Sequence, residues 1–425
     1  MPLSVAPAVY AREIKACRKR QQWQEALDLL LRAEKQRLRL NIILCSSAIG
    51  ACEASTAWLQ ALLAFQDIRR RWLEPSIITL SSVISSCEKA AEWQRAFLQL
   101  ENLNVLALAG DVIIHSALTS ACEKASEWQE ALRHLGSCSR RRVEASLVTY
   151  NAATSACEKA GVRKRKRAEW QQALQLLQEV GERELQKDSI LYGAAISCCE
   201  KAAKLREALQ LLREAECLRV RPSVSMYSAA ISACESAAEG AWETALELLC
   251  GMEARQLAPN VVSCSAACSA CAKASAWRWA LRLLCQAHRK QLAPNVITYS
   301  AAITACERAS EWQQALQLWQ EAQRSVPGDV VICTSLLSAC ARAAAARPGV
   351  GLFQDLRLAR VRPNLVTYTA ALTCFEKRAC MTEMLQVVDD MTLRLHCFAA
   401  ALRRKDSGVQ RCDYGHSAGC SGPLV

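Results

Sequence analysis

The chain has 425 residues, of which 52% are hydrophobic, and a formal net charge of +12 at pH 7. A single hydrophobic core stops growing at roughly 250–300 residues, so this length indicates two or three globular domains unless the chain is built from repeats. With only 15 Gly and 10 Pro, the composition argues against extended β architecture, and no run of 18 or more apolar residues is present to form a membrane-spanning helix.

One phrase recurs along the sequence, for example ITYSAAITACERASEWQQALQL at residues 297–318. Its period of 35 residues is the signature of a stacked array of helical units. Each copy predicts a first helix that ends near Glu-Lys-Ala, a second helix that opens at Glu-Trp-Gln, and a basic loop such as 255–260. Eleven copies begin, in chain order, at Pro7, Ile42, Ile77, Val112, Leu147, Ser189, Val224, Val261, Val296, Val330 and Leu365.

Two copies carry extra residues between their helices: seven around Arg163–Arg167, and two at Glu239 and Gly240. Insertions in such a loop leave a stack intact, which supports the placement of the helix boundaries. The run Arg-Lys-Arg-Lys-Arg at 163–167 leaves three interpretations open: a nuclear-localisation signal, an RNA-contacting loop, or a solvated insertion.

The first helix of each copy has two faces, with positions numbered from 1 at the first residue of the copy. At 100° per residue, positions 4, 7, 8 and 11 share one side, and in the fifth copy these are Tyr150, Ala153, Thr154 and Cys157. This side is the predicted packing face. Positions 2, 5, 9 and 13 fall on the opposite side, and their residue types also repeat, which burial alone does not require.

On this second face, an aliphatic residue, a small polar residue and a cation recur once per copy, as a regularly spaced nucleotide chain would need. Position 2 is Ile43, Ile78, Ile113, Val148, Ile190, Val262, Ile297, Val331 and Val366. Position 5 is Ser46, Ser81, Ser116, Asn151, Ser228, Ser265, Ser300, Thr334 and Thr369. Position 13 is Lys19, Lys89, Lys124, Lys159, Lys201, Lys273, Arg308, Arg342 and Lys377.

Ten of the 24 cysteines occupy position 11. Equivalent helices in a stack lie about 8–10 Å apart, whereas the Cα atoms of two cysteines in a disulfide lie within about 7 Å of each other. This difference argues against disulfides between the cysteines of neighbouring repeats. They are predicted to be small buried residues in a reducing compartment. The triplet Cys264, Cys268 and Cys271 lies on the packing face without a histidine, so core packing is favoured over a metal site. The tryptophans that open the second helices are predicted to pack between repeats rather than to stack on bases.

These residues resemble the pentatricopeptide repeat family over roughly residues 7–399, as an array similar to dinoflagellate and plant-type organellar members. The phrase Ser-Ala-Cys-Glu-Lys-Ala-x-Glu-Trp-Gln-x-Ala-Leu resembles the variant common in dinoflagellate algae. The resemblance implies that one repeat binds one RNA base, which position 2 sandwiches and which position 5 and the last residue of the repeat read. The last residues are Asn41, Ser76, Asp111, Ser146, Asp188, Ser223, Asn260, Asn295, Asp329 and Asn364.

The resemblance also implies base preferences: U for Asn151 with Asp188; A for Ser228 with Asn260, Ser265 with Asn295 and Thr334 with Asn364; G for Ser81 with Asp111 and Ser300 with Asp329. Ala11 and Gly193 offer no side-chain hydrogen bond, and the Ser46/Ser76 and Ser116/Ser146 pairs are ambiguous, so the readable register is broken.

Each part of this pattern also has a purely structural interpretation. Asp, Asn and Ser before a helix are favoured N-caps, worth about 1 kcal/mol over Ala. Small residues at positions 5 and 9 let helices approach closely, and the position 13 cations could form a solvated face. The recurrence of all three types on one helical face is what favours RNA binding over these alternatives.

The predicted fold is therefore all-α, a right-handed α-solenoid of tandem helix-turn-helix repeats over 7–399, with a short extension at 1–6 and a disordered tail at 400–425. The predicted function is sequence-specific binding of single-stranded RNA in post-transcriptional processing, stability or translation of organellar transcripts. The protein is predicted to be a monomer that acts without catalysis, metal or cofactor. Processing enzymes would be recruited in trans. The alternative is a tetratricopeptide-like protein-binding scaffold, whose period is 34. The resemblance implies a chloroplast or mitochondrion, although no transit peptide is visible and a cytoplasmic location stays open.

Overall fold

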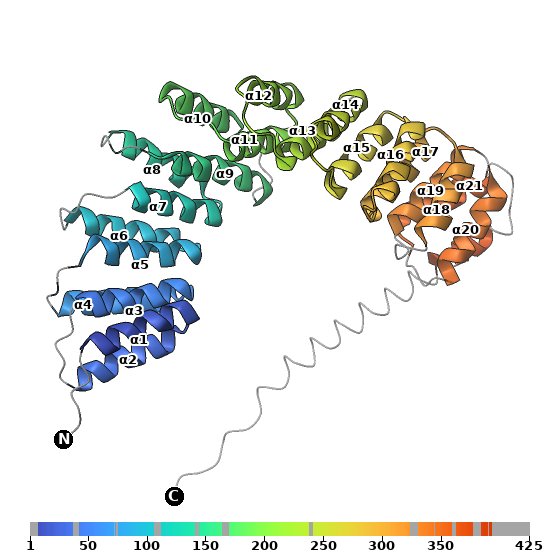
Figure 1. Ribbon diagram of the computed structural model, residues 1–425. Coiled ribbons are helices and arrows are strands. Elements are labelled where there is room, and N and C mark those ends of the chain that lie inside the picture. Colours follow the sequence, from blue (N-terminus) through green and yellow to red (C-terminus); the bar gives the residue numbers. More distant parts are fainter. Residues whose placement is uncertain are drawn as a thin grey trace, which may run out of the picture. The chain divides into compact units, whose positions relative to one another are not determined.

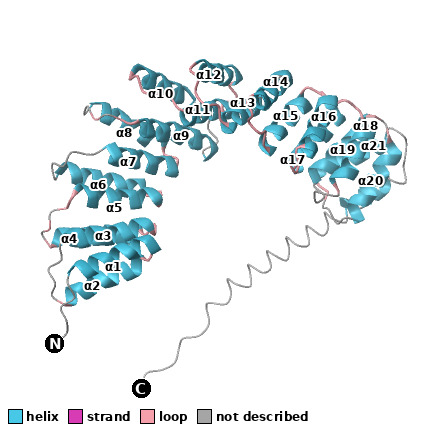
Figure 2. Cartoon of the chain, viewed as in Figure 1, coloured by secondary structure: helices cyan, strands magenta, loops and turns pink. Residues whose placement is uncertain are grey.

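The computed structural model describes residues 7–36, 42–71, 73, 75–105, 112–140, 143, 145–163, 170–237, 241–323, 330–343, 345–358, 363–376, 384–389 and 391–392, with side chains in most of them. The described residues form α-helices joined by loops, and none of them lies in a β-strand (Figure 2). They are α1 (Pro7–Arg20), α2 (Trp23–Lys35), α3 (Ile42–Ala54), α4 (Trp58–Arg70), α5 (Ile77–Lys89), α6 (Trp93–Val105), α7 (Val112–Ala125), α8 (Trp128–Arg140), α9 (Leu147–Arg163), α10 (Trp170–Glu182), α11 (Ser189–Lys201), α12 (Leu205–Cys217), α13 (Val224–Ser236), α14 (Trp242–Ala254), α15 (Val261–Lys273), α16 (Trp277–Arg289), α17 (Val296–Arg308), α18 (Trp312–Ala322), α19 (Val330–Arg342), α20 (Ala346–Leu358) and α21 (Leu365–Glu376).

The prediction of an all-helical array of two-helix repeats is confirmed, because every predicted copy begins at the first residue of an odd-numbered helix (Figure 1). The contacts divide the chain into an N-terminal unit, residues 1–237 with 254–257, and a C-terminal unit, residues 238–253 with 258–425. Among the described helices, none is long and apolar enough to cross a bilayer.

Within each unit, a repeat contacts its neighbours. In the N-terminal unit the first helices α1, α3, α5, α7, α9, α11 and α13 pack side by side in that order, and each second helix packs against its own first helix and the next one. In the C-terminal unit α15, α17, α19 and α21 repeat the arrangement. Each unit is thus a stack of hairpins in which the first helices form one layer and the second helices another.

The packing face predicted for the first helix is confirmed in the fifth repeat, where Tyr150, Ala153, Thr154 and Cys157 are fully buried. Ala and Cys at the buried positions allow neighbouring helices to approach closely. The cysteines at position 11 are all buried thiols, as predicted. Trp23, Trp58 and Trp93 pack against the core of the first repeats, and Trp128 and Trp170 against the core around Cys157, as expected for packing between repeats.

In several repeats a residue with positive φ follows the end of the first helix, for example Thr56 (φ 58°) after α3 and Ala91 (φ 60°) after α5. After this residue the backbone N–H of Ala57 donates to the carbonyl of Cys52 at 3.0 Å, and that of Glu92 to Cys87 at 3.0 Å. These bonds satisfy carbonyls that the end of a helix leaves without a partner. The turn brings the tryptophan of the second helix back toward the core.

Candidate functional site

The aliphatic residues at position 2 form an exposed row on the first helices. Their relative exposure runs from 57% for Val262 to 71% for Ile78, while adjacent residues such as Thr79 and Leu80 are fully buried. The row comprises Ile43, Ile78, Ile113, Val148 and Ile190 in the N-terminal unit, and Val262, Ile297, Val331 and Val366 in the C-terminal unit. β-branched residues are poorer helix formers than Ala or Leu, so neither helix propensity nor core packing explains their recurrence at an exposed position.

The position 5 hydroxyl groups lie one helical turn from this row and donate to the backbone of their own helix. Ser81 donates to the carbonyl of Ile78 at 2.9 Å and Ser116 to that of Ile113 at 2.8 Å. The same bond to the position 2 carbonyl is made by Ser46, Ser228, Ser265 and Ser300, and Thr334 and Thr369 donate to the carbonyl four residues earlier. Because the hydroxyl proton is used within the helix, the oxygen lone pairs are the part offered to a ligand.

Position 5 and the last residue of the repeat meet directly in the fifth repeat. The Nδ2 of Asn151 donates to Oδ2 of Asp188 at 2.9 Å, while Oδ1 of Asp188 accepts from the backbone N–H of Leu191 at 2.9 Å. The Oδ1 of Asn151 is buried and has no hydrogen-bond partner among the described residues. The two residues that the resemblance paired across 37 positions are thus in direct contact.

The structural interpretation of the last residues as N-caps is also correct. Asn295 Oδ1 accepts from the backbone N–H of Thr298 at 2.9 Å, and Asn364 Oδ1 from Thr367 at 2.8 Å. Ser76, Ser223 and Asn260 cap their helices in the same way. A cap uses the carbonyl oxygen of an asparagine and leaves its NH₂ group as a donor, so capping and ligand recognition are compatible in one side chain.

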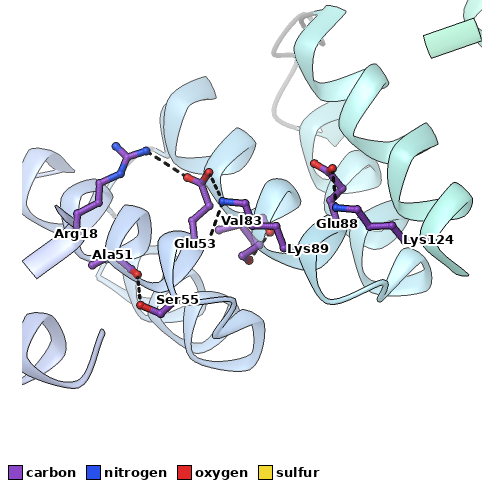
Figure 3. Close-up of polar contacts among 9 residues, drawn as sticks. Arg18, Ala51, Glu53, Ser55, Val83, Glu88, Lys89 and Lys124 are labelled. Carbon is purple, nitrogen blue, oxygen red and sulfur yellow. Dashed lines mark hydrogen bonds and ion pairs between the residues drawn. The ribbon is translucent and has the colours of Figure 1, made fainter. Parts of the chain in front are cut away.

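In at least five repeats the cation at position 13 pairs with the glutamate at position 12 of the preceding repeat, a ladder that the sequence reasoning missed. Figure 3 shows its start, where Glu53 binds both Arg18 and Lys89, and Glu88 binds Lys124. The Nζ–Oε1 distances are 3.2 Å for Lys89–Glu53, 3.1 Å for Lys124–Glu88, 2.7 Å for Lys159–Glu123 and 2.9 Å for Lys201–Glu158. Arg342 lies 3.8 Å from Glu307.

The ladder also caps helices. Lys89 donates to the backbone carbonyl of Glu53 at 3.1 Å, and Arg308 to that of Lys273 at 2.9 Å. A cation at the carboxyl end of a helix is favourable because it binds the last carbonyls and opposes the helix dipole. The Glu-Lys dipeptide at a period of 35 was the signal in the sequence that could have revealed this pairing.

Glu200 occupies the same position 12, but the residue at position 13 of the next repeat is Ser236. Burial is the main reason why the pKa of the Glu200 carboxyl is raised to about 7, and Glu158 and Glu235 raise it further against the opposing effect of Lys201. Glu200 is therefore partly protonated at neutral pH.

Several of the buried thiols at position 11 stay protonated at neutral pH, and a protonated thiol is a poor nucleophile. Burial raises the pKa of Cys52, Cys87 and Cys271 to about 11 and that of Cys122, Cys199, Cys306 and Cys340 to about 12. Cys264, Cys268 and Cys271 are buried on the packing face, as expected for core residues.

Several predicted residues are not placed. Asn41, Asp111, Asp329, Lys377, the insertion Glu239–Gly240 and the tail 400–425 lie outside the described residues, as do the side chains of the basic run 163–167. The assignment of residues to base reading, base sandwiching and phosphate contact stays a prediction.

The family model described as pentatricopeptide repeat domain matches residues 175–236, 247–308 and 318–378, and a second model, PPR repeat, matches residues 297–325. No curated protein matches the chain.

Among solved structures, the chain is similar to the pentatricopeptide repeat protein PPR10 from maize, with a TM-score of 0.58 and 16% sequence identity. This overlay covers 91% of the chain and 59% of the maize protein, so the chain spans less than two thirds of that protein. Looser overlays involve PPR10 in complex with an 18-nucleotide psaJ RNA element (TM-score 0.38, 16% identity, 89% and 68% covered) and the PPR domain of Arabidopsis thaliana protein-only RNase P 1 in complex with tRNA (TM-score 0.40, 17% identity, 44% and 98% covered). The maize overlay supports the fold, and the two looser ones carry no argument.

Proposed function

We propose that this chain, which belongs to the pentatricopeptide repeat family, binds single-stranded RNA along the exposed face of its first helices and acts by binding rather than by catalysis. The observation that carries the proposal is the row of Ile and Val residues at position 2, each at least 57% exposed among the nine described.

The spacing of the repeats explains why this row is aliphatic. Packed helices lie about 8–10 Å apart, whereas the stacked bases of one strand lie about 3.4 Å apart. If each repeat takes one base, the bases must be separated, and an apolar group has to fill each gap. A short branched side chain such as Ile113 fits that role without a flexible polar end.

The edges of the bases would then face position 5 and the last residue. An asparagine whose Oδ1 caps the helix, such as Asn295, offers an NH₂ donor, whereas Asp188 offers carboxylate acceptors. This difference in donors and acceptors agrees with the base preferences that the family resemblance implies, and on that resemblance we assign A to the repeats with Asn295 and Asn364, and U to the repeat with Asn151 and Asp188. One repeat per base is part of the proposal.

The RNA backbone has to compete with carboxylates for the cations at position 13. Lys124 is 40% exposed and Lys159 47% exposed in their ion pairs, and surface pairs of this kind are worth about 0–1 kcal/mol. A phosphate can therefore share the lysine at low cost, and we propose that it does so. We further propose a role in post-transcriptional processing of organellar transcripts, with any enzyme recruited in trans.

The first test is a selection from a randomised pool of short single-stranded RNAs at two salt concentrations. We expect enrichment of A at the sites facing the repeats with Ser265/Asn295 and Thr334/Asn364. Salt-sensitive binding without a motif would support RNA binding without base reading, because phosphate contacts alone depend on salt in this way. Absence of RNA binding would contradict the proposal and favour the protein-binding scaffold.

The row itself is tested with Ile113→Ser, and Leu98→Ser on α6 is the matched control because Leu98 is also exposed, at 48% against 64% for Ile113. We expect Ile113→Ser to weaken RNA binding by about fivefold, which corresponds to about 1 kcal/mol of binding free energy. The free energy of unfolding should change by less than about 0.5 kcal/mol. The control should leave affinity unchanged. Equal affinities of both variants and the parent in a fluorescence-anisotropy titration would rule out the row as the contact surface.

A further inference from the structure

We propose that His115, His134 and Cys138 form a binding site for one metal ion that prefers thiolate and imidazole ligands, Zn²⁺ or Cu⁺, inside the fourth repeat. The side chains are all buried, and their ligand atoms lie within 4.8 Å of one another. The two imidazoles come from α7 and α8, and the cysteine follows His134 by one helical turn on α8.

The distances suit coordination. The Nδ1 of His115 lies 3.1 Å from Nε2 of His134 and 3.3 Å from Sγ of Cys138, and Sγ lies 3.9 Å from Nε2. Ligands at the usual zinc–nitrogen and zinc–sulfur lengths of about 2.0 and 2.3 Å are about 3.3–3.8 Å from one another in trigonal or tetrahedral geometry. Small side-chain rotations therefore suffice to admit the ion.

A supporting hydrogen bond is already in place around one ligand. The Nδ1 of His134 lies 3.4 Å from Oγ1 of Thr119, whose hydroxyl donates to the backbone carbonyl of His115 at 3.0 Å. With its proton on Nδ1 directed at Thr119, His134 presents the lone pair of Nε2 toward His115 and Cys138, where a cation would bind. Imidazoles that bind metals are commonly oriented through their second nitrogen in this way.

The fourth repeat departs from the other ten at all three positions together. Position 4 is Tyr in six repeats and Leu or Cys in four, position 23 is aliphatic except for Gln99, and position 27 is aliphatic or methionine in every other repeat. Substituting two imidazoles and a thiol into one apolar core is costly unless they bind each other or a ligand. Packing alone does not call for the three changes together.

Hydrogen bonds among these three side chains explain the cluster less fully than a bound metal ion does. The Nδ1 of His115 faces both Nε2 of His134 and Sγ of Cys138, and one ring nitrogen either donates a single proton or accepts one. A metal ion satisfies the three converging atoms at once. On binding, the thiol of Cys138 loses its proton to solvent as the sulfur–metal bond forms, while both imidazoles bind in their neutral form.

The ligand set defines the class of metal. A thiolate with two imidazoles selects soft or borderline ions such as Cu⁺ and Zn²⁺ over Mg²⁺ or Ca²⁺, which require oxygen ligands. The bound ion would link α7 to α8 and stabilise this hairpin. His115, His134 and Cys138 lie on buried faces, so the site is separate from the exposed row at position 2 and does not depend on RNA binding.

The test compares the full chain with Cys138→Ala, His115→Tyr and the control Cys122→Ala. Cys122 is equally buried on α7, and Tyr is the residue that most repeats carry at position 4. After loading with Zn²⁺ or, under reducing anaerobic conditions, with Cu⁺, competition with a chromophoric chelator gives the affinity. Cobalt(II) reports thiolate ligation through its charge-transfer absorption.

We expect one tightly bound ion in the parent and in Cys122→Ala, at least about tenfold weaker binding in both site variants, and a metal-dependent rise in the melting temperature only where the ion binds. The chain has 24 cysteines, so metal ions can also bind weakly at other thiols. The difference between the parent and the site variants removes this background from the measured affinity. If Cys138→Ala fails to fold, His115→Tyr decides the question. Unchanged affinity in the site variants, or no tight binding of either ion by the parent, overturns the proposal.

Discussion

Glu200 shows how one residue can differ from its equivalents in a repeat protein. Glu53, Glu88, Glu123 and Glu158 each have a cation from the following repeat, and Glu200 has Ser236 at that place in the sequence. Its carboxyl is half-buried and has no cation of the next repeat at that place, which favours the neutral form and raises its pKa to about 7. A difference of one residue in one repeat thus changes the protonation of its neighbour.

The pH dependence of folding follows from this shift. Between the ordinary pKa of 4.5 and about 7, the folded chain holds the proton of Glu200 more tightly than the unfolded chain. This contribution to stability is therefore complete below pH 4.5 and is lost as the pH rises through about 7. We expect Glu200→Gln to stabilise the protein at pH 8 by up to about 3 kcal/mol and to have little effect at pH 5.

Denaturant unfolding at the two pH values measures this effect, with Glu123→Gln as the control because Lys159 pairs with Glu123. The variant Ser236→Lys should supply the missing cation and also raise stability at pH 8. A Glu200→Gln variant that is less stable than the parent at pH 8 would contradict the assignment of a raised pKa.

At the scale of the helix, the turns that follow the first helices contain local backbone strain. The residue that closes them has positive φ although it is not glycine, as with Thr56, Ala91 and Ser126. A side chain with a Cβ is disfavoured in this conformation, and a β-branched one most of all. Thr56 is therefore the least suited of the three to its place.

We expect Thr56→Gly to raise the free energy of unfolding by about 1 kcal/mol, because glycine adopts this conformation without steric cost. Ala54→Gly, two residues earlier in the last turn of α3, should lower it by about 0.5–1 kcal/mol. Thermal or urea unfolding of the two variants decides the matter. Destabilisation by Thr56→Gly would show that the threonine side chain contributes contacts that outweigh the backbone strain.

At the scale of the whole molecule, stability is distributed along the array. Each repeat buries its apolar face only against its neighbours, so the free energy is approximately a sum of repeat and interface contributions. The buried cysteine at position 11 of each repeat becomes accessible only when the adjacent helices separate. Thiol reactivity therefore reports opening of individual repeats.

We expect Cys217, Cys250 and Cys285, which are exposed, to be alkylated within the first minutes at pH 8. The position 11 thiols such as Cys122 and Cys306 should react orders of magnitude more slowly, since burial blocks access and raises their pKa to about 12. Mass spectrometry of peptides after timed alkylation distinguishes them. Equal rates for Cys285 and Cys306 would show that the C-terminal unit is loosely packed under these conditions.

Much of the architecture could be predicted because it is periodic. A repeat of 35 residues, a helical pattern of buried Ala and Cys, and an Asn or Ser before the first helix are local signals, and local signals determine local structure. The exposure of Ile113 and its equivalents was predictable for the same reason, since a helix of known packing face places position 2 on the opposite side.

What the sequence by itself determined is therefore the helical array, its register and the residue types on each face. Only the tertiary structure decided other meetings of side chains between helices: Lys124 with Glu88 across 36 residues, and His115 with His134 and Cys138. These contacts depend on how one helix is set against the next. The physical reason is that periodicity gives the direction of each side chain around its own helix, whereas the offset between packed helices gives its partner.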